Sequence, residues 1–223
     1  HGSLGTMMFK IGEINVARTG LTLRRARENG FDAEAVIVSG LDRAHYYDNA
    51  KHVILKVIAD RNTKVILGAQ GYGMGEVVSK VQLLACAITH FLTLDDVFNV
   101  DLGYAPVFNT PVDLVQTACL VLSNKIENLV KTITVEGFEQ ERANVKGIID
   151  VSPFSEHVFH FIPGSMNIPL ENIRLEGIPF KKDAQVILYS HTSSGAYKAY
   201  RYLTSRGYAN LWVLEGGYLC WER

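Results

Sequence analysis

The residues best placed to do chemistry lie in the segment ILYSHTSSGAYKAYRYL, residues 187–203. A short β-branched and aliphatic run ends in small polar residues, and a helical pattern follows. In such a loop, backbone N–H groups converge on a negative group at the helix N-terminus. The pattern therefore predicts an anion-binding loop. Its residues are Ser190, His191, Thr192, Ser193, Ser194 and Gly195.

Two kinds of chemistry could use this loop. A nucleophile would need His191 to take a proton from Ser190, but adjacent residues seldom place a base on the neighbouring hydroxyl, and no orienting acid is evident. An anion-binding pocket needs only the loop amides and hydroxyls. We favour the pocket, and a hydrolase or transferase that uses Ser190 stays as an alternative.

The bulk composition is that of an ordinary soluble globular protein. The chain has 223 residues, 48% hydrophobic and 20% charged, which suits one large or two small domains. Its net charge of −1 gives no reason to expect nucleic acid or a membrane surface as a partner. Cys86, Cys119 and Cys220 form no CxxC or Cys/His cluster, so we expect no metal site or disulfide framework. Sparse cysteines fit a reducing cytoplasm.

The elements around the loop indicate a parallel sheet. Short apolar runs at 147–152, 186–190 and 211–217 alternate with helical segments such as 194–206. Strand–helix–strand alternation is typical of a small parallel α/β sheet, in which sites lie beyond the carboxyl ends of strands. Three features fall there: Asp150, Ser190 and the pair Gly216-Gly217.

The first half of the chain reads differently. Runs at 33–40, 52–60 and 64–70 predict strands, and Asp60-Arg61-Asn62-Thr63 predicts a hairpin turn between the last two. Helical patterns lie at 20–30, 77–92 and 111–125. Thr93, which follows the second of these, is expected to cap a further short helix. The prediction is an α+β domain over 4–134, with an antiparallel sheet covered on one side, and an α/β domain over 135–223.

The second half resembles the rhodanese family. The motifs are IIDVS (148–152), HFIPGSMNIPL (160–170), the loop segment above and LEGGYLCW (214–221). Sulfur transfer in that family needs a cysteine at the first loop position, because a thiolate holds the sulfur as a persulfide. Here Ser190 stands at that position, Gly195 falls where an arginine often stands, and Ser152 replaces another frequent arginine. The resemblance therefore implies a degenerate rhodanese-like domain that forms no thiocyanate from thiosulfate and cyanide.

The first half resembles the C-terminal dimerisation domain of pyridine nucleotide-disulfide oxidoreductases, of the CoA-disulfide reductase and NADH oxidase type. The motifs are VARTGLTLRRARENGF (16–31), AHYYDNA (44–50), GAQGYG (68–73) and DLGYAPVFNTPVD (101–113). The resemblance implies a homodimer in which this domain lends side chains to the partner subunit's active site. Tyr104 and one of Tyr46 and Tyr47 match family tyrosines that assist a thiolate there. Otherwise these tyrosines are interface aromatics with satisfied hydroxyls.

Groups that move electrons are missing from this sequence. No GxGxxG follows a strand and leads into a helix, and the glycines of 68–76 have the wrong spacing, so we read them as backbone turns. We therefore expect the C-terminal portion of a reductase whose FAD and NAD(P)H domains precede it. Its substrate would be a small thiol or disulfide species (CoA disulfide, CoA persulfide or polysulfide) or else oxygen. On this view the chain alone binds neither cofactor. The alternative is a non-catalytic dimeric binding module for an anionic or CoA-type ligand.

Overall fold

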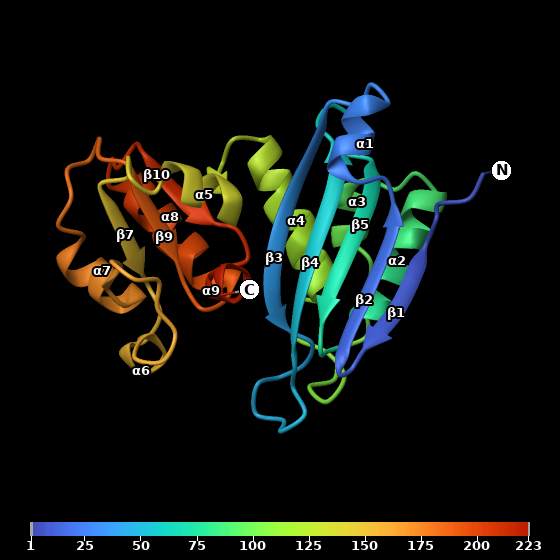
Figure 1. The fold of residues 1–223 in the computed structure, drawn as a ribbon, viewed down its shortest axis with the longest axis horizontal. Coiled ribbons are helices and arrows are strands. Elements are labelled where there is room, and N and C mark those ends of the chain that lie inside the picture. Colours follow the sequence, from blue (N-terminus) through green and yellow to red (C-terminus); the bar gives the residue numbers. More distant parts are fainter. Residues whose placement is uncertain (1, 223) are drawn as a thin grey trace. The chain divides into compact units, whose positions relative to one another are not determined.

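The computed structural model describes residues 2–222, which form two compact units divided between Glu127 and Asn128. Each unit has a sheet of its own, as Figure 1 shows. The fold classes predicted for the two halves are both confirmed: an antiparallel sheet with helices comes first, and a parallel α/β sheet follows. The division into functional domains at 134/135 stays a prediction.

The first unit is built on five antiparallel strands in the order β1-β2-β5-β4-β3. The predicted turn between β4 and β5 is present, and Asp60 Oδ1 fixes it by accepting hydrogen bonds from the backbone N–H of Asn62 (3.0 Å) and Thr63 (2.8 Å). The strands are β1 (Met7–Ile11), β2 (Ile14–Gly20), β3 (Ala33–Leu41), β4 (His52–Asp60) and β5 (Ile66–Gly73).

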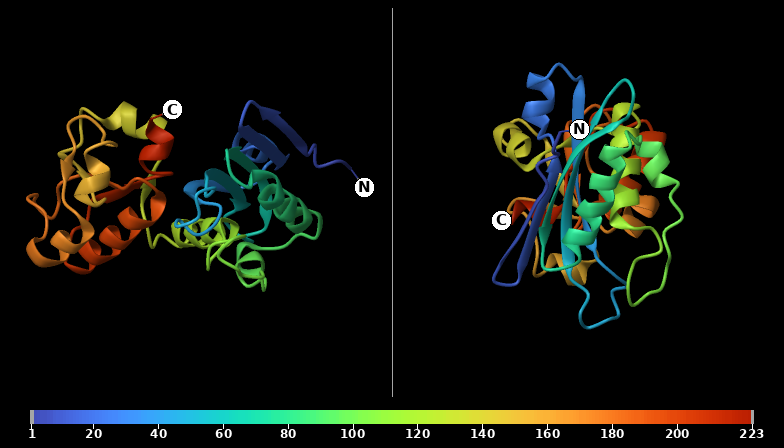
Figure 2. Two further views of the ribbon diagram at one scale, coloured as in Figure 1. Left: turned by 90° about the horizontal axis from the view of Figure 1, so that it is seen from below. Right: turned by 90° about the vertical axis from the view of Figure 1, so that its right-hand side faces the viewer.

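Helices cover both faces of this sheet unequally. Figure 2 shows the three later helices on one side of the strands and α1 on the other. On its side, α1 buries Ala26 against Ala35 and Ile58. Thr93 caps α3 through a capping box with Asp96, as predicted for this threonine. The helices are α1 (Leu23–Glu28), α2 (Val77–Thr89), α3 (Leu94–Phe98) and α4 (Leu114–Ile126).

The glycines of residues 68–73 lie in the strand β5, so reading them as turns was wrong, whereas Gly75 does lie in the bend that precedes α2. Residues from Gly68 to Gly73 pair with both β2 and β4. A Cβ on Gly71 would lie 2.7 Å from Val77 Cγ1 and 3.0 Å from Val81 Cγ2. The glycines are there because α2 and the neighbouring strands approach this backbone too closely for side chains.

Residues 7–20 form a hairpin that the sequence did not predict. β1 and β2 pair through five residue pairs, from Met7↔Arg18 to Ile11↔Ile14. Gly12 in the turn has a φ of +56°, which favours glycine. All five residues of β1 are exposed, so its apolar side chains do not alternate between core and solvent. Without that alternation the usual signal of a half-buried strand is absent.

The second unit is a parallel sheet in the order β6-β10-β9-β7-β8. Separate apolar clusters pack on its two faces: Leu188 lies in one, and its neighbour Ile187 lies in the other. The strands are β6 (Thr132–Ile133), β7 (Gly147–Asp150), β8 (Met166–Asn167), β9 (Val186–Tyr189) and β10 (Leu211–Leu214). The helices are α5 (Val135–Glu141), α6 (Phe154–His157), α7 (Leu170–Glu176), α8 (Ser193–Ser205) and α9 (Tyr218–Trp221).

Candidate active-site loops

The predicted tyrosines lie on two loops at one end of the first sheet (Figure 1). Tyr46 and Tyr47 belong to the loop between β3 and β4, and Tyr104 belongs to the loop between α3 and α4. A backbone hydrogen bond joins the loops, from the N–H of Ala44 to the carbonyl of Pro106 (3.1 Å). The structure therefore brings together residues that lie almost 60 positions apart in the sequence.

Tyr46 differs from Tyr47 in exposure. The side chain of Tyr46 is 63% exposed and that of Tyr104 is 51% exposed, whereas Tyr47 is half-buried. Slight loss of hydration and the nearby phenols of Tyr104 and Tyr47 raise the pKa of Tyr46. A phenol with the ordinary tyrosine pKa of about 10 is already protonated at neutral pH, so both Tyr46 and Tyr104 can donate a hydrogen bond.

The loop that carries Tyr104 is held at both of its ends. Near α3, the side-chain amide of Gln116 donates to the carbonyls of Phe98 (2.9 Å) and Val100 (3.0 Å). At the start of α4, Asp113 forms a buried ion pair with Lys80, with 2.5 Å between Nζ and Oδ2. The side chain of Tyr104 is therefore exposed, while the loop that carries it is held in place at both ends.

In the second unit, the hydroxyl of Ser190 is occupied by the loop itself. It donates to the carbonyl of Thr192 (2.5 Å) and accepts from the N–H of Ala196 (3.1 Å). Ser190 is 6% exposed, and a Cβ on Gly195 would lie 2.9 Å from its Oγ. This serine caps the first turn of α8, and its proton is already committed to a carbonyl. The geometry does not favour a nucleophilic role.

The remaining loop residues are placed as the sequence predicted them, around the start of a helix. Thr192 is the N-cap residue of α8, and Ser193 is its first residue. Ser194 is exposed, whereas His191 and Gly195 are half-buried. The backbone N–H of His191 donates to Ser152 Oγ (2.9 Å), which ties the loop to the end of β7.

A group of histidines beside this loop was missed by the sequence reading. Asp150 is fully buried, and its Oδ2 lies 2.8 Å from His157 Nδ1. The ring of His160 lies 4.9 Å from that of His191, centroid to centroid, and both approach Tyr218. Burial and the neighbouring His160 lower the pKa of His191, so its neutral form is favoured. A signal in the sequence that could have found this group is that His157 follows Asp150 by seven residues.

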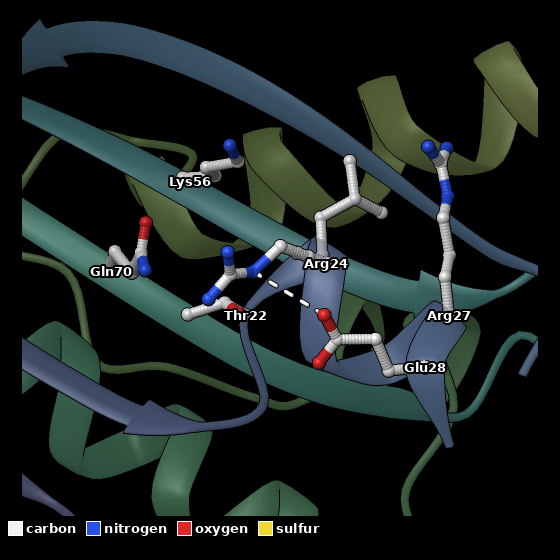
Figure 3. A pocket seen from close by; sticks show the side chains of 7 residues that line it. Thr22, Arg24, Arg27, Glu28, Lys56 and Gln70 are labelled. Carbon is white, nitrogen blue, oxygen red and sulfur yellow. Dashed lines mark ion pairs between the residues drawn. The ribbon is translucent and has the colours of Figure 1, made fainter.

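A hollow of about 510 Å³ lies at the other end of the first sheet, by α1. Figure 3 shows Arg24 turned toward Glu28, with 3.5 Å between Nε and Oε1, while Lys56 and Gln70 project from β4 and β5. None of the predicted tyrosines lines it, and we assign it no role. Its lining consists of Thr22, Leu23, Arg24, Arg27, Glu28, Lys56 and Gln70.

The glycine-rich segment does not form a dinucleotide-binding fingerprint. It is β5, a strand paired antiparallel on both sides, whereas the pyrophosphate fingerprint lies at the first turn of a parallel βαβ unit. Within residues 2–222, no group of three or more His, Cys, Asp or Glu side chains could hold a metal ion. Over the same residues, every helix is too short or too polar to cross a membrane.

Two known families match the chain, one in each half. Residues 7–115 match the pyridine nucleotide-disulphide oxidoreductase dimerisation domain, and residues 135–223 match the rhodanese-like domain. Both agree with the resemblances read from the motifs.

Named relatives match about half of the chain. The CoA-dependent NAD(P)H sulfur oxidoreductase of Pyrococcus furiosus is 35% identical over 107 residues, which is 48% of this chain and 24% of that protein. The coenzyme A disulfide reductase of Staphylococcus haemolyticus is 30% identical over 114 residues, 51% of this chain and 26% of that protein. The chain thus spans about a quarter of the length of these relatives.

Solved structures match the chain over both halves. The NAD-dependent persulfide reductase from A. fulgidus has a TM-score of 0.90 at 31% identity, covering 99% of this chain and 40% of that one. The reduced CoADR-RHD of Bacillus anthracis has a TM-score of 0.88 at 29% identity, covering 98% and 39%. This chain therefore consists of a pyridine nucleotide-disulfide oxidoreductase dimerisation domain followed by a rhodanese-like domain.

Proposed function

We propose that this chain is the C-terminal part of a cytoplasmic, homodimeric, FAD-dependent NAD(P)H:disulfide oxidoreductase. Its substrate would be CoA disulfide, CoA persulfide or polysulfide, or else oxygen. Support comes from the order of the two domain matches and from the reductases among the relatives. The observation that carries the proposal is the pair of exposed phenols, Tyr46 and Tyr104, on loops that a hydrogen bond joins.

The two phenols would act by hydrogen bonding and proton donation. When a disulfide or persulfide is cleaved, a thiolate leaves, and a protonated phenol can donate its proton or a hydrogen bond to that sulfur. Tyr46 suits this role because its phenol is exposed and lies on a loop that is hydrogen-bonded to the loop of Tyr104. In our proposal Tyr46 and Tyr104 reach the partner subunit's site, and Tyr47 supports the loop. FAD and NAD(P)H would bind to parts of the polypeptide that this chain does not span.

The rhodanese-like domain would shape the site without transferring sulfur. The Ser190 hydroxyl cannot hold a stable persulfide and is bonded to the backbone. The isolated chain is therefore expected to be neither redox-active nor a sulfurtransferase.

The test uses the longest native polypeptide that contains this chain. We would record its flavin absorbance and its consumption of NADH and NADPH with CoA disulfide. A flavin-containing protein that turns over supports the proposal if Tyr104→Phe lowers turnover by about 100-fold or more. Tyr202→Phe is the matched control, because the Tyr202 hydroxyl lies in the second unit and donates to the carbonyl of Arg174 there (3.1 Å).

A flavin-free native protein would contradict the proposal. The competing function is then a dimeric binding module for an anionic or CoA-type ligand, since the N-terminus of a helix such as α8 favours a negative group. Equilibrium binding of CoA that is lost in Ser193→Glu would favour that module.

A further inference from the structure

A buried carboxylate at the end of β3 organises the loop that carries Tyr46. Asp42 is 1% exposed and accepts four hydrogen bonds. Two come from the guanidinium of Arg43, from Nε to Oδ1 (3.1 Å) and from Nη2 to Oδ2 (3.0 Å). The others come from the backbone N–H of Lys51 (3.0 Å) and Glu76 (3.3 Å). The side chain therefore closes the base of the 42–51 loop.

The fit around this carboxylate leaves little freedom. A Cβ on Gly75 would lie 2.9 Å from Asp42 Oδ2 and 2.9 Å from the carbonyl of Lys51. Burial alone would raise the pKa of Asp42, but the hydrogen bonds from Arg43 and from the Lys51 backbone hold it below its usual range. Asp42 thus stays charged and keeps the Arg43 guanidinium in one orientation.

Arg43 spans from this carboxylate to the second loop. Its Nη1 donates to the carbonyl of Val107 (3.3 Å), next to the bond between Ala44 and Pro106 (3.1 Å). The Arg43 side chain is 15% exposed, so most of it is buried. Two adjacent bonds therefore tie the loops within two or three residues of Tyr46 and of Tyr104.

We propose that Arg43, oriented by Asp42, is a positioning residue that sets the separation of the Tyr46 and Tyr104 phenols. This inference rests on the function proposed above for those tyrosines. A planar guanidinium can bind a carboxylate with two nitrogens and still donate to a carbonyl with the third. A lysine ammonium keeps the charge but cannot reproduce that fork, so Arg43→Lys separates geometry from charge.

The first test measures the coupling of the loops in the 223-residue chain. Hydrogen exchange of the Ala44 amide is followed by NMR in Arg43→Lys and in Asp42→Asn, two variants that act on different ends of the same contact. Each should speed exchange about five- to tenfold. Arg61→Lys is the matched control, because Arg61 pairs with Glu34 at the opposite end of β4. Unchanged exchange at Ala44 in both test variants overturns the coupling.

The second test asks whether the coupling matters for the tyrosine. In the longest native polypeptide, turnover of CoA disulfide is compared for Arg43→Lys, Tyr104→Phe and the double variant. If Arg43 acts through Tyr104, the double variant is no slower than Tyr104→Phe alone. Losses that multiply would overturn the positioning role. Full turnover by Tyr104→Phe would refute the role proposed for that tyrosine and the positioning role with it, whereas the reductase function itself fails only if the native protein lacks flavin or turnover.

Discussion

Lys80 and Asp113 form an ion pair that is almost fully removed from water. Their charged atoms lie 2.5 Å apart, and each side chain is 7% exposed. Asp113 also accepts the N–H of Val115 (2.7 Å), which caps α4 at the point where the Tyr104 loop ends. One carboxylate therefore links α2, α4 and the loop of the candidate site.

Removing the lysine should be costly. Lys80→Met leaves the Asp113 carboxylate buried without its cation, so we expect the free energy of unfolding of the first unit to fall by about 3–5 kcal/mol. Urea denaturation followed by far-UV circular dichroism measures this. Adding Asp113→Asn, which keeps a capping side chain, should recover part of the loss. A change below about 1 kcal/mol in Lys80→Met would contradict the burial argument.

Ser190 is expected to behave as a structural residue. Ser190→Ala removes the acceptor for the N–H of Ala196, so we expect a loss of about 1–2 kcal/mol in the stability of the second unit. Both tryptophans of the chain, Trp212 and Trp221, lie in that unit, and their fluorescence reports its unfolding.

Ser194→Ala is the control for this change, because Ser194 is exposed. An esterase or phosphatase rate that disappears in Ser190→Ala would restore the nucleophile hypothesis. Thiocyanate formation by the wild-type chain would likewise contradict a degenerate loop. Cys119 offers no substitute thiolate, since burial raises its pKa to about 12.

The second unit should lose stability in mild acid through His191. Burial and His160 depress the pKa of His191 in the folded state, so the unfolded state binds a proton more readily. The contribution is present above the ordinary histidine pKa of about 6.5 and is lost as the pH falls below it, with a limiting slope of about 1.4 kcal/mol per pH unit.

The measurement is tryptophan-monitored urea denaturation at several pH values between 7.5 and 5. His191→Phe keeps a ring against Tyr218 and removes the titrating group, so it should flatten the dependence. An equally steep dependence in that variant would show that other groups cause it.

Gly71→Ala should destabilise the first unit, although it adds only one methyl group. Its Cβ would meet Val77 Cγ1 at 2.7 Å inside the packed core, and overpacking of this kind costs about 1–3 kcal/mol. Gly103→Ala is the matched change, because a Cβ there meets nothing within 4 Å, and we expect an effect within about 0.5 kcal/mol. Thermal unfolding followed by circular dichroism compares the stabilities of the two variants. Equal melting temperatures would contradict close packing at β5.

Much of the fold could be predicted because burial leaves a periodic pattern. The apolar spacing of α2 and the alternating pattern of β4 follow from one face being packed. β1 escaped prediction because all of its residues are exposed. The glycines of β5 misled us because the sequence gives no sign of which helix will approach a strand.

The candidate site was predictable by residue type but not by arrangement. The tyrosines and the Ser190 loop could be named from motifs. The folded loops were needed to show that Tyr46 is exposed whereas Tyr47 is half-buried. Arg43 went unnoticed because its partner Val107, 64 residues later in the sequence, is brought to it only by folding.

The short strand β6 has a practical consequence for dissecting the protein. Thr132 and Ile133 pair with Val213 and Leu214 at the edge of the second sheet, ahead of the matched rhodanese-like segment. A recombinant fragment that started at residue 135 would leave the β10 edge open to strand addition by another molecule, and aggregation would follow. Expression boundaries placed before Asn128 keep that edge covered.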